Sequence, residues 1–271
     1  MLQGVALRKF RRTAAGREVY YSIRFGKRLI QVRDQRAAWS VDKWNRARRV
    51  ARLLRIIPTI QLVGTTGGLA MNNASQDDDI DLFIVAAPQT LWITRLLATI
   101  ITEAMGVRRH PDDRIITNKI CLNMFVTGDA LAVPKNERDL FTAHEVLQMI
   151  PLLNRNNTYQ QFLHSNRWVK TFLPQAWQEK SQISNFNVQR GKRFYKNSLS
   201  MLIIMIWSLR FIEPLARNVQ LWYMRQRRTT EVVSDQVLRF HPRDARMWIK
   251  SELTRRLARF NVPLDKIFYG G

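Results

Sequence analysis

Short apolar runs and a helical segment alternate through the middle of the chain, between residues 58 and 135. The runs are rich in β-branched and aromatic side chains, as buried strands are. The helical segment has Pro88 at its start and Gly106 just beyond its end, which is the usual asymmetry of a helix. Their order and short connections predict a mixed α/β unit. The expected elements are strands at 59–63, 80–86 and 119–127 and a helix at 89–103.

A small basic hairpin is expected near the N-terminus. The run 18–25 has strand composition, and residues 26–27 offer a turn into a second strand at 28–30.

A helix capped by Ser40 is expected next, and Pro58 ends it. It has an apolar stripe made of Ala47, Val50, Leu54 and Ile57. Another face carries basic residues, which can either keep the helix soluble or contact phosphates. These residues are Arg48, Arg52 and Arg55.

Helical patterns dominate after residue 136, and strand signals vanish there. The chain is therefore expected to be α+β, with a small mixed-sheet core and a mostly helical C-terminal region. The three predicted regions are 1–57, a basic hairpin and helix; 58–135, the α/β core; and 136–271, the helical region. The expected helices of the last region are 137–150, 158–172, 194–228 with Pro214 inside, and 243–260.

The longest apolar stretch, within 199–212, is shorter than the about 20 residues that a bilayer span needs. It is interpreted as a buried helix or as an interfacial one, with membrane-surface contact through residues 192–215.

Charge narrows the range of partners. Lys and Arg total 44 against 21 Asp and Glu, which gives a net charge of +23. This imbalance favours polyanions, namely nucleic acid such as RNA, nucleotides or an anionic membrane surface. The single cysteine, Cys121, excludes an internal disulfide and a zinc site built on cysteines. With no secretory signal at the start of the sequence, the expected location is cytoplasmic.

Four carboxylates crowd into five positions, which are Asp77, Asp78, Asp79 and Asp81. Like charges so close are costly unless a cation or water compensates them. Strand alternation puts Asp79 and Asp81 on the same side, where the pair could hold Mg²⁺ or Mn²⁺. Asp77 and Asp78 are interpreted as turn caps.

A glycine turn precedes the carboxylates. Gly67 and Gly68 let backbone N–H groups approach phosphate oxygens without an intervening Cβ, and a helix that starts there adds a favourable dipole. Together, the turn and the carboxylates indicate a nucleotide site.

These motifs resemble a known family. Thr66-Gly67-Gly68, ten intervening residues and then Asp79-Ile80-Asp81 are similar to the signature of the DNA polymerase beta nucleotidyltransferase superfamily, and more closely to bacterial stand-alone nucleotidyltransferase-domain proteins. The resemblance implies an enzyme that transfers a nucleoside monophosphate from an NTP to a hydroxyl acceptor. It makes Asp79 and Asp81 the catalytic and metal-binding pair, and Gly67 and Gly68 the nucleotide-binding turn.

Two positions depart from the family pattern. Gly68 stands where most members have Ser, and Asn123 stands where active members have a third carboxylate. An amide cannot act as a general base. Three alternatives follow: a loop acid reaches the site, chemistry proceeds without it, or the protein binds nucleotide or RNA without turnover. The loop acids are Asp112, Asp113 and Asp129.

Other polar residues carry weaker signals. Arg95, Arg114 and Lys119 could contact a triphosphate or be solvated. The histidines, including His144 beside Glu145, show no metal-ligand spacing and are interpreted as structural. With no Walker loop or serine elbow, a P-loop ATPase or α/β-hydrolase is disfavoured.

Overall fold

The computed structural model describes residues 8–11, 19–22, 27–181, 199–225, 232–240 and 245–259. Its strands are β1 (Arg8–Arg11), β2 (Val19–Ser22), β3 (Ile60–Thr65), β4 (Ile80–Ala86), β5 (Ile120–Thr127), β6 (Ile150–Asn154), β7 (Val232–Val233) and β8 (Val237–Arg239). Its helices are α1 (Lys27–Leu54), α2 (Gly67–Ala70), α3 (Leu91–Ala104), α4 (Leu140–Gln148), α5 (Thr158–Ser165), α7 (Leu199–Met224) and α8 (Ala245–Ala258), with 3₁₀ turns η1 (Lys135–Glu137) and η2 (Arg167–Thr171).

A mixed six-stranded sheet forms the centre, in the order β6-β3-β4-β5-β8-β7. Strands β4 and β5 are parallel and are joined through α3, and the other neighbours pair antiparallel. The predicted α+β class is confirmed, as are the strands and the helix expected between residues 58 and 135. Because β6 and β8 follow residue 136, the sheet also uses the C-terminal region, and the division at residues 57 and 135 stays a prediction.

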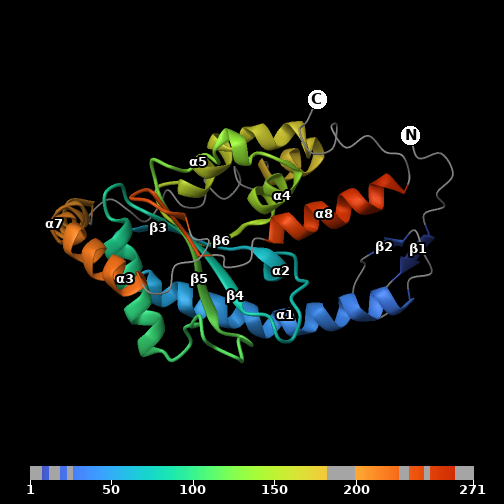
Figure 1. Cartoon of the computed structure of the whole chain (residues 1–271), viewed down its shortest axis with the longest axis horizontal. Coiled ribbons are helices and arrows are strands. Elements are labelled where there is room, and N and C mark those ends of the chain that lie inside the picture. The colour runs from blue at the N-terminus through green and yellow to red at the C-terminus, as the bar shows by residue number, and fades with distance from the viewer. Residues whose placement is uncertain are drawn as a thin grey trace.

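Side chains of β4 alternate between two apolar cores. Ile80, Leu82 and Ile84 pack in the core that includes residues of α1, α3 and α7. Phe83 and Val85 pack in the core that includes residues of α4 and α5. Figure 1 shows α4 and α5 on the side of the sheet away from α1. By alternation, Asp81 belongs to the α4 side, together with Phe83.

The N-terminal prediction was partly wrong. A hairpin exists, but β2 pairs with β1 and not with residues 28–30, which lie in α1. Helix α1 also runs through Ser40, which therefore does not cap it. The Ser40 hydroxyl donates to the Arg36 carbonyl at 2.7 Å and accepts the Ala74 N–H at 3.3 Å. Because these bonds satisfy the Ser40 hydroxyl in the middle of α1, this side chain is not available to cap a helix start.

The expectation that strands vanish after residue 136 was also wrong. Strand β6 is short, contains Pro151 and lies at the sheet edge, the position that tolerates a missing N–H. The helix expected at 158–172 divides into α5 and η2 at Asn166, whose side chain bonds the backbone of Leu131 and Val133. Helices α7 and α8 confirm the last two predictions, whose outer ends lie outside the described residues.

Helix α7 fastens onto the first turn of α3 through polar contacts. The Glu213 carboxylate accepts the N–H groups of Trp92 and Ile93 at 2.7 and 2.8 Å. The Gln220 amide donates to the Trp92 carbonyl at 2.8 Å. Helix α3 therefore has its otherwise unpaired N–H groups satisfied from another helix rather than by its own cap. Among the described helices, none is both long and apolar enough to cross a bilayer.

The Glu213 contact predicts a stability effect. In Glu213→Ala the two N–H groups of α3 lose their acceptor, so the free energy of unfolding should fall by about 1–2 kcal/mol. Glu213→Gln keeps an acceptor oxygen and is the matched control. Urea denaturation of both variants checks this, and an alanine variant as stable as the glutamine variant would contradict it.

Candidate functional site

Asp79 and Asp81 lie at the beginning of β4, as predicted, and the structure brings them together. Asp81 is paired in register with Cys121 of β5. Ligand atoms of Asp79, Asp81 and Cys121 all lie within 4.8 Å of one another. The site therefore combines two carboxylates and a thiol at the start of two neighbouring parallel strands.

A guanidinium compensates one of these carboxylates. Arg109 Nη1 lies 2.6 Å from Asp79 Oδ2, and the Asp79 side chain is only 12% exposed. Arg109 is held just outside β5, where its N–H donates to the Ile120 carbonyl at 2.8 Å. Such a pair in a poorly solvated place is stronger than a surface ion pair.

Burial and the charge of Asp79 raise the pKa of Asp81 to about 7, and the charge of Glu145 acts in the same direction. A hydrogen bond with Cys121 and the charge of Arg109 oppose this rise. The pKa of the Cys121 thiol is also raised, first by burial and then by the charges of Asp81 and Asp79. The raised pKa values of Asp81 and Cys121 mean that a further negative charge beside Asp79 is disfavoured as long as no cation compensates it, which is the property of a site for a cation.

The glycine turn lies against the same carboxylates. Gly67 has a φ of +64°, and a Cβ at this position would lie 3.2 Å from Asp81 Oδ2. The Thr65 hydroxyl and the Thr66 N–H both donate to the Asp81 carbonyl, at 3.1 and 3.3 Å. Glycine at position 67 therefore allows this left-handed backbone conformation and leaves space beside the Asp81 carboxylate.

Gly68 is constrained by packing, since a Cβ there would lie 3.3 Å from Ala74 Cα. The helix predicted after the turn is confirmed as α2, but it has only four residues. Its dipole is correspondingly small, so backbone N–H groups are what the turn offers to a phosphate.

A cavity of about 480 Å³ opens between the glycine turn and the helices α4 and α8. His144 and Glu145 of α4 lie on its wall. The sequence had led us to interpret His144 as structural and had given Glu145 no role of its own. The residues that line this cavity are Gly67, Gly68, Met71, Asn73, Leu140, Phe141, His144, Glu145, Gln148, Ile249 and Leu253.

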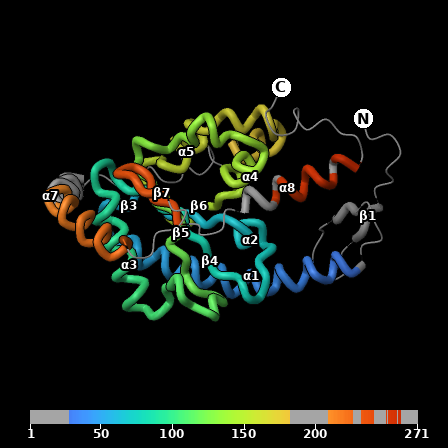
Figure 2. Tube along the Cα trace, in the orientation of Figure 1, coloured from blue at the N-terminus to red at the C-terminus, as the bar shows by residue number. Residues whose placement is uncertain are grey.

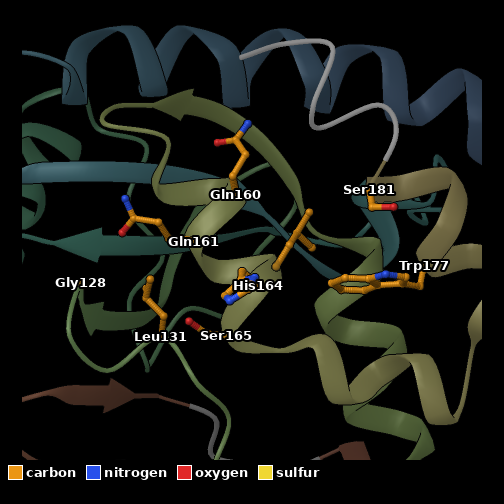
Figure 3. Close-up of a pocket in the computed structure, with 9 residues that line it drawn as sticks. Gly128, Leu131, Gln160, Gln161, His164, Ser165, Trp177 and Ser181 are labelled. Atoms are coloured by element: carbon orange, nitrogen blue, oxygen red, sulfur yellow. The ribbon is translucent and has the colours of Figure 1, made fainter. Parts of the chain in front are cut away.

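A larger cavity, of about 590 Å³, lies at the opposite end of the strands. It includes Gly128, whose N–H bonds the Ala86 carbonyl at the far end of β4. Figure 3 shows its wall, which includes His164, Trp177 and the amides of Gln160 and Gln161. Because its described lining residues include no carboxylate, this cavity does not offer the ligands that a hard cation needs.

The third position of the cluster differs from the sequence expectation. The pairing of β4 with β5 is irregular between Asp81 and Phe83, whose partners are Cys121 and Met124. Cys121, rather than Asn123, therefore lies beside Asp81.

Among the described residues the loop acids do not join the group either. Asp113 pairs with Lys119 at 2.9 Å, and Asp129 accepts a long bond of 3.5 Å from Gln236.

The cap expected of Asp78 is confirmed, because its carboxylate accepts the N–H and hydroxyl of Ser75 at 2.7 and 2.6 Å. Asp77 is exposed.

Two of the basic residues considered for contact with a triphosphate lie elsewhere or are exposed. Arg95 instead bonds Gln220, and its guanidinium carbon lies 4.5 Å from the Phe240 ring centroid, while Arg114 is exposed.

Lys43 supports the loop before β4, and sequence reasoning missed it. Its side chain is buried, and its ammonium donates to the carbonyls of Gln76 and Asp78 and to the Asn118 side chain, at 2.5 to 3.1 Å. A signal was available, because Lys43 occupies the position four residues before Ala47 in the apolar stripe of α1.

No protein-family model matches the sequence, and no curated protein matches it. Among solved structures, a toxin-antitoxin crystallised with AMP-PNP is 16% identical, with a TM-score of 0.28 over 52% of this chain and 98% of that chain. A mutant of the toxin-antitoxin MntA-HpeT is 14% identical, with the same TM-score and coverage. Similarity at this level does not establish a shared fold or activity.

The raised pKa of Asp81 predicts a pH-dependent stability. Between about pH 4 and 7 the unfolded chain loses this proton while the folded chain keeps it, so the carboxyl's contribution to stability falls and then levels off. Asp81→Asn removes this penalty. Its stability relative to the unsubstituted protein should improve by at least about 1 kcal/mol from pH 5 to pH 8. Urea denaturation in metal-free buffer measures this difference, and a difference that does not change with pH would contradict the assignment.

Proposed function

We propose that this chain is a metal-dependent nucleotidyltransferase that transfers a nucleoside monophosphate from an NTP to a hydroxyl acceptor. One observation carries the proposal: the clustered ligand atoms of Asp79, Asp81 and Cys121 lie against the Gly67 turn, which lines a cavity of about 480 Å³. The reaction needs NTPs, which fits the predicted cytoplasmic location.

The residues present fit a divalent cation. Two carboxylates supply the hard oxygen ligands that Mg²⁺ and Mn²⁺ prefer. The missing Cβ of Gly67 keeps the space beside Asp81 Oδ2 open. Asp79 and Asp81 would hold the cation, which would neutralise charge on the triphosphate and make an attacking hydroxyl more acidic.

Arg109 competes for the same carboxylate. In the structure it compensates Asp79, and its own side chain remains 32% exposed. When Asp79 binds a cation instead, the guanidinium can meet a phosphate oxygen, for which its planar donors are suited. Before the nucleotide arrives, Arg109 would therefore offset the negative charge of Asp79. Afterwards, its guanidinium would pair with the negative charge of the triphosphate.

The remaining groups on the cavity wall divide the work of the transfer. The acceptor oxygen forms a bond to the α-phosphorus, the α–β phosphoanhydride bond breaks, and pyrophosphate leaves. Glu145, which lines the cavity and whose charge acts on Asp81, would accept the proton of the acceptor hydroxyl. The N–H groups of the Gly67 and Gly68 turn would hold phosphate oxygens in place.

Calorimetric titration of Mg²⁺·NTP tests the nucleotide site. Asp79→Asn and Asp81→Asn should each weaken binding by at least about tenfold, because a charged contact contributes about 1.5–3 kcal/mol. Asp77→Asn is the matched control, since Asp77 belongs to the same acidic run but is exposed. Metal-independent binding of equal strength in all variants would contradict the proposal. Metal-dependent binding with no transfer from a labelled NTP to any hydroxyl would instead support a nucleotide-binding protein without turnover.

The thiol predicts a metal preference. Thiolate is a soft ligand, so Cys121 should add affinity for Zn²⁺ or Cd²⁺ and little for Mg²⁺. In Cys121→Ala the affinity for Cd²⁺ should fall by about tenfold or more, while that for Mg²⁺ should change by less than about threefold. Calorimetry with each metal alone measures both values. Equal losses for the two metals, or no loss for either, would show that the thiol is not a ligand.

A further inference from the structure

The outer face of helix α7 exposes a row of large apolar side chains. Phe211 is 81% exposed, Trp222 74% and Leu215 64%. At about 3.6 residues per turn these three positions fall on one side of the helix, and three further apolar residues extend the row. The complete row, called here the α7 stripe, is Phe211, Ile212, Leu215, Val219, Trp222 and Tyr223.

Polar contacts fix this orientation. The inward face of α7 contains Glu213 and Gln220, which bond the backbone of α3, and Arg217, which bonds Asp235 at 2.7 Å. Ala216 and Met224 on the same face are buried. A surface helix normally turns its apolar side to the core and its polar side to water, whereas α7 has apolar side chains on its inward face and large apolar side chains exposed on its outer face as well. The exposed stripe therefore belongs to the folded structure and marks an interaction surface.

We propose that the α7 stripe inserts into the interfacial layer of an anionic lipid bilayer, so that the protein binds the membrane surface peripherally. Trp222 and Tyr223 are amphipathic aromatics, which favour the boundary between lipid headgroups and acyl chains. Phe211 and Leu215 supply apolar surface for the layer beneath.

Charge selects this occupant. Between residues 209 and 225 the sequence has a single acidic residue, Glu213, and its carboxylate is bonded to α3. The α7 stripe therefore presents no carboxylate. Arg225 is exposed at the end of the helix, and the whole chain carries a net charge of +23. An anionic bilayer attracts such a surface, whereas a second copy of this chain would bring a second large positive charge against it.

Membrane contact through α7 leaves the nucleotide site accessible. Figures 1 and 2 show α7 at one extremity of the long axis, and α2 and α8 beyond the sheet from it. The cavity beside Gly67 and Glu145 lies between α2, α4 and α8. A protein bound through the stripe would therefore keep this cavity open to solution.

Co-sedimentation of the full chain with vesicles tests the proposal. The protein should pellet with vesicles of phosphatidylcholine and phosphatidylserine and pellet much less with phosphatidylcholine alone, and added salt should reduce the bound fraction. Leu215→Glu and Trp222→Glu should each weaken binding by about tenfold or more, because each replaces an inserted apolar group by a charge.

The matched control is Ile115→Glu, since Ile115 is 73% exposed but lies in the loop before β5. It adds the same negative charge and should bind vesicles almost as the unsubstituted protein does. Circular dichroism should show all three variants folded, because each changed side chain is exposed.

Three results would overturn the inference. The first is an absence of binding to vesicles of either composition, and the second is equal binding by the stripe variants and the Ile115→Glu control. The third is sedimentation velocity showing a dimer that Trp222→Glu dissociates, without vesicle binding, because the stripe would then join two copies of the chain.

Discussion

Two carboxylates at the start of β4 lie close together, and the organisation of the site depends on the repulsion between their charges. Asp79 is paired with Arg109 at 2.6 Å, while burial and the charge of Asp79 raise the pKa of Asp81 to about 7. The Cys121 thiol lies in the same cluster. Because the charge of Asp79 keeps the pKa of Asp81 raised despite the nearby Arg109, the cluster gains stability from any further cation that reaches it.

The surrounding structure holds this unfavourable arrangement in place. Strands β4 and β5 are anchored between two apolar cores, so the backbone that carries the two carboxylates is fixed by packing. Lys43 fixes the loop that leads into β4, and Gly67 leaves room beside Asp81. The close carboxylates thus lower the stability of the fold, as is common at sites whose groups are held in position for a ligand.

Local patterns predicted the central elements, because the periodicity of Leu82, Ile84 and their neighbours reports burial directly. Asp79, Asp81, Gly67 and Gly68 could be singled out in the same way, from spacing along one stretch of chain. Cys121 could not, since an irregular register between β4 and β5 decides which residue meets Asp81. Arg109 and Glu145 depend on how distant segments pack, and β6 was hidden by its length and by Pro151.

The central claim is that Asp79 and Asp81 hold a divalent cation in place of Arg109. Diffraction at the manganese absorption edge, from crystals of this chain soaked with Mn²⁺, tests it directly. The account predicts an anomalous peak between the two carboxylates, with the Arg109 guanidinium moved away from Asp79. Density showing Arg109 still paired with Asp79, and no anomalous peak beside Asp81, would contradict it.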